Sequence, residues 1–85
     1  MIITITKQDY DQAIKIAKGD IGVAFISNRD CFLATAIKRQ LDCQSVNVGA
    51  IECDIDNDTY EIVNYNSVIA LKHSPKILPL EVELK

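Results

Sequence analysis

The sequence is poor in the residues that mark several classes of protein. It has two prolines and three glycines among 85 residues, with 48% hydrophobic and 25% charged residues, a globular balance that argues against a disordered or low-complexity chain. Its apolar runs are far shorter than the roughly 18 residues that a membrane span needs. The start, MIITITKQDY, lacks the basic flank and long apolar run of a signal peptide. We therefore expect one cytoplasmic domain, residues 1–85, without membrane contact.

Histidine and cysteine are too few and too widely spaced for a zinc site. Cys31, Cys43 and Cys53 are 12 and 10 residues apart, and His73 is the only histidine. A zinc site uses about four such ligands at short paired spacings. An odd number of cysteines without a secretory signal fits reduced thiols better than disulfides. We expect no metal and no cofactor.

Two interpretations of Cys31 stay open. It is expected at the first turn of a helix, where unpaired backbone N–H groups and a partial positive charge stabilise a thiolate. Nucleophilic catalysis also needs a base, and the one candidate, His73, belongs to a distant segment. Core packing is the preferred interpretation. Because a glycine-rich phosphate loop and a Ser-His-Asp order are missing too, we expect no enzyme and no catalytic residue.

The periodicity of the chain predicts an α+β domain, with a mainly antiparallel sheet and two or three helices packed on one face. Thr6 and Asp9 form an acidic variant of the capping box and open a helix that ends at Gly19. The other expected elements are a strand at 2–6, a strand at 21–27, a helix at 31–41 capped by Asn28 or Asp30, a short helix capped by Asn66 or Ser67, and a strand over 78–84 that Pro79 either begins or places at an outer position.

Residues 46–62 predict further strands. Val46 and Val48 would point to one face of the sheet. In the alternating run that follows, the apolar residues stand at odd-numbered positions instead of even-numbered ones. One extra residue in a bulge at Gly49 would bring the apolar residues of both runs to the same face. The pair Asn57-Asp58 predicts a two-residue hairpin turn, which would place Asp54 opposite Glu61. The core side of this hairpin is expected to hold Ile51, Cys53, Ile55, Tyr60 and Ile62.

Basic residues are missing from the middle of the chain: no Lys or Arg lies between Gln40 and Leu71. That interval holds the acidic residues Asp42, Glu52, Asp54, Asp56, Asp58 and Glu61. The alternating aspartates are like the start of a calcium loop, but Thr59 and Tyr65 stand where such a loop needs glycine and a bidentate glutamate.

Like charges directly opposite each other in a sheet destabilise it by a few tenths of a kcal/mol to about 1 kcal/mol. A small domain tolerates this cost more readily if the face has a use, such as meeting the basic surface of a host or phage protein. The alternative is that the carboxylates keep an exposed sheet soluble and block edge pairing. A net charge of −3 argues against direct binding of nucleic acid.

Four segments of the chain, "DCFLATAIKRQL", "VNVG", "YEIV" and "LPLEVEL", resemble a diffuse group of small phage and prophage proteins of unknown role. The resemblance spans about residues 30–84, with Phe32 where those proteins have proline. It implies a setting in a mobile genetic element and supplies no catalytic residue.

The resemblance and the acidic interval together predict a small non-enzymatic interaction protein. In that setting it would be a stoichiometric inhibitor of a host defence or nucleic-acid enzyme, of the anti-CRISPR kind, that uses the six acidic residues. The alternatives are a structural or assembly module that forms a homodimer, and a thiol-dependent enzyme that uses Cys31.

Overall fold

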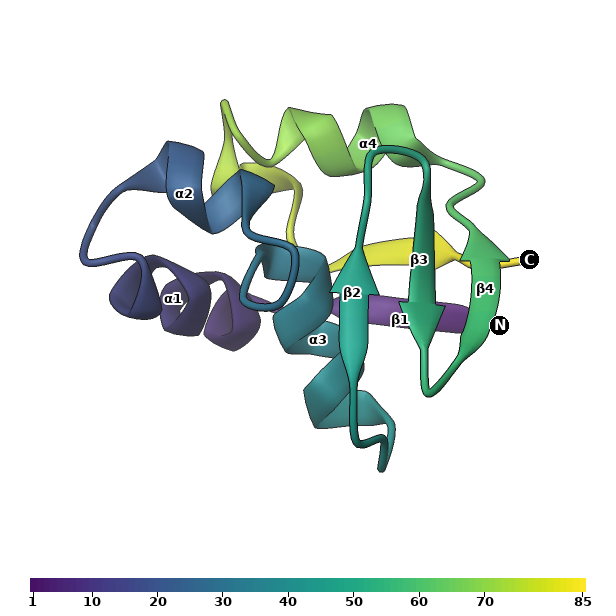
Figure 1. The fold of residues 1–85 in the computed structure, drawn as a ribbon. Helices are drawn as coiled ribbons and strands as arrows, with labels where there is room; N and C mark the ends of the chain where they lie inside the picture. Colours follow the sequence, from purple (N-terminus) through teal and green to yellow (C-terminus); the bar gives the residue numbers. More distant parts are fainter.

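The computed structural model describes residues 1–85 and shows a mixed α+β domain (Figure 1). All of its strands pair antiparallel, as the sequence predicts. In chain order the elements are β1 (Ile2–Ile5), α1 (Lys7–Ile16), α2 (Ile21–Ile26), α3 (Phe32–Gln40), β2 (Val46–Val48), β3 (Glu52–Ile55), β4 (Asp58–Glu61), α4 (Tyr65–Ala70), a 3₁₀ turn (Pro75–Ile77) and β5 (Leu80–Glu83).

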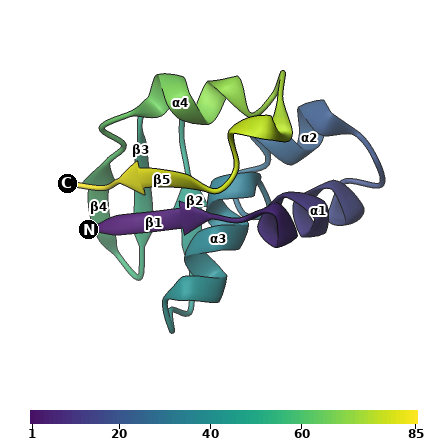
Figure 2. The same ribbon diagram turned by 180° about the vertical axis from the view of Figure 1, so that it is seen from behind.

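The strands form two sheets that meet at a corner. One sheet has the order β1-β5 and the other the order β2-β3-β4. In Figures 1 and 2 the first sheet runs across the second. The end of β4 and the residue after it join the two sheets, because Glu61 and Lys85 exchange backbone hydrogen bonds of 2.8 and 3.0 Å, and Ile62 pairs with Leu84. The two sheets therefore pack on two sides of one hydrophobic core.

Helix α3 is the centre of that core. It contacts β1, β2 and α1, and so it touches both sheets. Its buried side chains are Phe32, Leu33, Ala34, Ala36 and Ile37. They belong to a single cluster of 19 buried residues that also includes the inward side chains of both sheets. Because the side chains of the two alanines are small, neighbouring elements can pack close to the helix backbone.

The capping box predicted at the start of α1 is confirmed. The Thr6 hydroxyl accepts a hydrogen bond from the Asp9 backbone N–H, and the Asp9 carboxylate accepts from the Thr6 N–H at 2.9 Å. The same carboxylate is only 2% exposed and receives two hydrogen bonds from Arg39 of α3, at 2.7 and 3.0 Å. One aspartate therefore caps α1 and ties it to α3. After the helix, Gly19 has φ +86°, a conformation that glycine adopts without strain.

The end of α3 is fixed to β1 by side chains. The Gln40 amide donates to Ile2 O at 2.7 Å and its Oε1 accepts from Thr4 N at 2.9 Å. Arg39 adds a hydrogen bond to Thr4 O at 2.9 Å. These contacts join residues more than 30 positions apart and fix how α3 lies on the first sheet.

The strand predicted over residues 21–27 is wrong, because this segment forms α2. Asp20 is the N-cap, and its carboxylate accepts from Val23 N at 3.2 Å. A buried strand would hide its apolar side chains, yet Ile26 is 68% exposed. A local cap therefore overrides the β-propensity of a short apolar run.

The predicted caps of two other helices also need correction. Helix α3 runs from Phe32 to Gln40, close to the predicted 31–41, but neither Asn28 nor Asp30 caps it. Cys31 does, with its Sγ accepting from Ala34 N at 3.4 Å. For α4 the N-cap is Asn64 instead of Asn66 or Ser67. The Asn64 side chain bonds the backbone of β5 instead of its own helix, so tertiary contacts decide this boundary.

The predicted hairpin exists, but its turn lies one residue earlier, at Asp56-Asn57. These residues have φ of +48° and +77°, as a two-residue turn of the I′ kind requires. The pairing therefore shifts: Asp54 lies opposite Thr59 and not opposite Glu61.

The bulge predicted at Gly49 is wrong as well. The chain turns back there, so that Val48 lies opposite Cys53 and β2 and β3 form a second hairpin. A side-chain carbon on Gly49 would lie 3.2 Å from Glu52 O, which explains a residue without one. Ile51, expected in the core, is at this turn and is 64% exposed. The predictions of Cys53, Ile55 and Ile62 as buried residues are confirmed.

The strand predicted over residues 78–84 is the shorter β5, Leu80–Glu83, and of the two places predicted for Pro79 the structure shows the one at its beginning. The Leu78-Pro79 peptide is cis, and β5 starts at Leu80. Pro79 lacks an N–H and lies just outside the ladder, which accounts for its place.

Candidate interaction face

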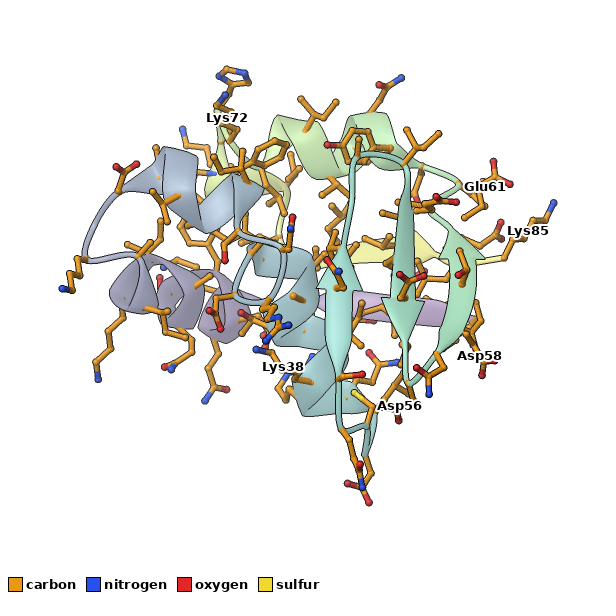
Figure 3. The ribbon with its side chains drawn as sticks, viewed as in Figure 1. Lys38, Asp56, Asp58, Glu61, Lys72 and Lys85 are labelled. Atoms are coloured by element: carbon orange, nitrogen blue, oxygen red, sulfur yellow. The ribbon has the colours of Figure 1, made fainter.

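The structure collects three of the six acidic residues on the solvent side of β2-β3-β4. Along β3, Cys53 and Ile55 are buried while Glu52 and Asp54 are exposed, and Glu61 of β4 is exposed too. We call this surface the outer sheet face; its residues are Asn47, Glu52, Asp54, Thr59 and Glu61. Figure 3 shows the side chains that stand out from these strands.

Glu52 and Glu61 lie directly opposite each other. Their neighbours Ile51 and Ile62 share a backbone hydrogen bond of 2.8 Å, so the glutamate pair is of the non-hydrogen-bonded kind, in which side chains stand closer together. The three ion pairs of the protein involve other carboxylates. Lys85 is joined to Glu61 through the backbone alone, so the two glutamates keep their charges exposed and unpaired.

Asp54 has a different environment from the two glutamates. Its carboxylate accepts a hydrogen bond of 2.6 Å from the Thr59 hydroxyl. It also lines a polar hollow of about 560 Å³ on whose walls Arg29 and Lys38 lie. The charge of this end of the face is therefore mixed. Sequence reasoning missed both cations, because they precede the acidic interval and only the fold brings them next to it.

The remaining three acidic residues lie outside this face. The Asp56 carboxylate accepts from the backbone N–H groups of Gln44 and Ser45, at 2.8 and 2.9 Å, and so holds the loop before β2 against the hairpin turn. Asp58 is exposed at the start of β4, near Asp56 and far along the strand from Glu61 (Figure 3). Asp42 is exposed in the loop after α3.

The thiols of Cys31 and Cys53 are poor nucleophiles in this structure. Cys31 is 3% exposed, and burial raises the pKa of its thiol despite hydrogen bonds from backbone N–H groups at the start of α3. Burial, with the charge of Asp54 as a smaller cause, raises the pKa of Cys53 to about 11. Both thiols are therefore protonated at neutral pH, which argues against the thiol-enzyme alternative.

No three His, Cys, Asp or Glu side chains are grouped so that they could hold a metal ion. The longest helix, α1, has 10 residues, and no helix combines the length and the apolar character that crossing a membrane would take.

Comparison of the chain with protein-family models, with curated proteins and with solved structures found no match.

Proposed function

We propose that the protein acts by stoichiometric binding to a partner protein with a basic surface, and that the outer sheet face makes the contact. The exposed pair of Glu52 and Glu61 carries this proposal. Two carboxylates at the closest spacing of a sheet repel each other in the free protein. A lysine or arginine of a partner placed between them would relieve that repulsion and gain a charge-assisted hydrogen bond.

The resemblance to phage proteins suggests what such a partner would be. Enzymes that handle nucleic acid carry basic grooves, and a protein that occupies such a groove competes with the nucleic acid. Inhibition of a host defence or nucleic-acid enzyme by this route needs no catalytic residue. The complex would form faster at low ionic strength, because opposite charges steer the encounter and salt screens them.

The test is affinity capture from a bacterial lysate with matched variants. Glu52→Gln with Glu61→Gln removes two charges from the outer sheet face, and Glu81→Gln with Glu83→Gln removes two from β5. We expect the first variant to lose a basic partner that the parent protein and the second variant retain at low salt. Equal capture by all three proteins would eliminate the outer sheet face as the binding surface.

Self-association is a second candidate function, which the exposure of α2 favours. Ile21, Val23 and Ile26 are all solvent-exposed large apolar residues on this short helix. A second copy that covered them would remove apolar surface from water. A molar mass by light scattering that rises with protein concentration, and that Val23→Asp returns to the monomer value, would support it; a constant monomer mass would eliminate it.

A further inference from the structure

An apolar cavity lies between elements that are far apart in the sequence. The end of α2, the start of α3, the turn between β2 and β3, and α4 each contribute part of its wall. Nine of its eleven lining residues are hydrophobic and none is charged. Cys31, the cap of α3, is one of them. The cavity is separate from the outer sheet face, because the two share no residue.

The cavity is large enough for a small molecule. Its volume is about 240 Å³. In another protein, an engineered cavity of about 150 Å³ lined by aliphatic and aromatic side chains stays dry and binds benzene. Pockets for drug-sized ligands begin at about 300 Å³. The size therefore fits a compound of one or two fused rings.

The walls are unusually rich in aromatic rings for this chain. Only five of the 85 residues are Phe or Tyr, and three of them, Phe25, Phe32 and Tyr65, line the cavity. A fourth, Tyr10, stacks on Phe32 with 4.7 Å between ring centroids. The Lys72 ammonium lies 5.5 Å from the centre of the Phe25 ring. Phe32 is 1% exposed and already stacked on Tyr10, so the half-buried rings of Phe25 and Tyr65 are the ones that can meet a planar aromatic ligand.

Backbone hydrogen bonds hold the walls in place. Val48 N donates to Asn28 O at 2.8 Å and joins β2 to the loop before α3. Cys31 N donates to Ser27 O at 3.1 Å, which fixes the same loop to the end of α2. A ligand would therefore enter a preformed site and would not need to order its walls.

We propose that this cavity binds a small, uncharged aromatic molecule of one or two fused rings. The apolar walls supply the affinity, and Asn28 and Tyr65 are the two lining residues whose side chains carry an amide and a hydroxyl, which can hydrogen bond to a polar edge of the ligand. Ile26, which is 68% exposed and also lines the cavity, gains burial when the ligand binds. This proposal does not depend on the outer sheet face, so either can fail without the other.

The experiment is a titration of the ¹⁵N-labelled protein with indole, followed by amide chemical shifts. We expect saturable shifts at Cys31, Gly49 and Val68, with a dissociation constant on the order of 0.1–1 mM because the ligand is small. Ile26→Asp puts a charge beside the apolar site and should weaken binding about tenfold. Ile16→Asp makes the same change at an exposed position of α1 that does not line the cavity, and should leave binding unchanged.

Shifts that do not saturate, or that Ile26→Asp and Ile16→Asp affect equally, would overturn the proposal. Indole-3-acetate, which adds a negative charge to the same ring, should bind more weakly than indole; equal affinity would contradict an uncharged site. N-acetyltryptophanamide separates the two sources of the ring. Weaker binding than that of indole would support a free small molecule as the occupant, and binding as tight as that of indole would overturn this in favour of an aromatic side chain of another protein.

Discussion

Replacement of Arg39 by methionine should destabilise the protein more than an ordinary surface substitution. Methionine keeps an apolar stem of similar length, but it removes the hydrogen bonds of 2.7 and 3.0 Å to Asp9. The Asp9 carboxylate is 2% exposed, so it would remain in the interior with only the hydrogen bonds from Thr6. Removal of one partner of a fully buried ion pair costs about 3–5 kcal/mol.

The expected cost is smaller here, because Arg39 is 42% exposed and water reaches part of the site. We expect the free energy of unfolding to fall by about 2–3 kcal/mol. A domain of 85 residues has a total stability of roughly 4–13 kcal/mol. For a domain of this size the same loss lowers the melting temperature by roughly 10–20 °C.

The acid side of the stability curve gives a second measure of the same pair. Burial on its own raises the pKa of Asp9, but hydrogen bonds from Arg39 and Thr6 outweigh it, so the pKa lies below the ordinary value of 3.8. A carboxyl group whose pKa is lower in the folded state stabilises the fold above its ordinary pKa and loses this effect as pH falls through the folded value. Without Arg39 the folded-state pKa of Asp9 rises toward its ordinary value, so less stability is left to lose on acidification, and the difference between the parent protein and Arg39→Met should shrink as the pH falls below 3.8.

Urea denaturation followed by circular dichroism, from pH 3 to pH 7, measures both effects. Asp9→Asn and the double variant complete a double-mutant cycle, which isolates the energy of the pair from that of the Arg39 bond to Thr4. A loss of less than about 1 kcal/mol in Arg39→Met at pH 7 would refute the reasoning, because it would place the pair in the range of exposed salt bridges.

Three further perturbations follow from the same geometry. Glu61→Gln should raise the free energy of unfolding by a few tenths of a kcal/mol to about 1 kcal/mol, since it relieves repulsion by Glu52; lower stability in urea would contradict this. Iodoacetamide at neutral pH should alkylate the half-buried Cys43 well before the buried Cys31. Mass spectrometry of peptides would show the order of labelling. Faster labelling of Cys31 would contradict this expectation and support Cys31 as a nucleophile. Asn57→Ala should cost about 1–2 kcal/mol, because alanine tolerates φ +77° poorly; an unchanged melting temperature would argue against the I′ turn.

Local sequence signals predicted the elements whose determinants are also local. Thr6 and Asp9 are three residues apart and form the predicted capping box. The apolar stripe of α3 and the missing N–H of Pro79 likewise determine the structure at their own positions in the chain. The α+β class and the antiparallel pairing followed from such signals. The arrangement of two sheets did not, because the backbone hydrogen bonds that hold them together at the corner join Glu61 to Lys85, which are far apart in the sequence.

The candidate face shows why a one-residue error matters. Both Asp56-Asn57 and Asn57-Asp58 are acceptable turn pairs by composition. Long-range hydrogen bonds decide between them, because the Asp56 carboxylate bonds the backbone of Gln44 and Ser45. The shift moves Glu52, not Asp54, to the position opposite Glu61. Sequence reasoning could not predict the aromatic cavity, since three separated segments of the chain build it.

The side chains at the end of α3 also bear on how the protein behaves at high concentration. Ile3 and Ile5 use their backbone groups to pair with β5, so the backbone groups of Ile2 and Thr4 face the open edge of the sheet. An open edge with the sequence IITI, rich in β-branched residues, is a template for another chain and for aggregation. The Gln40 amide occupies that edge as a neighbouring strand would. The side chain of one glutamine at the end of a helix therefore hinders another chain from pairing with the edge of β1.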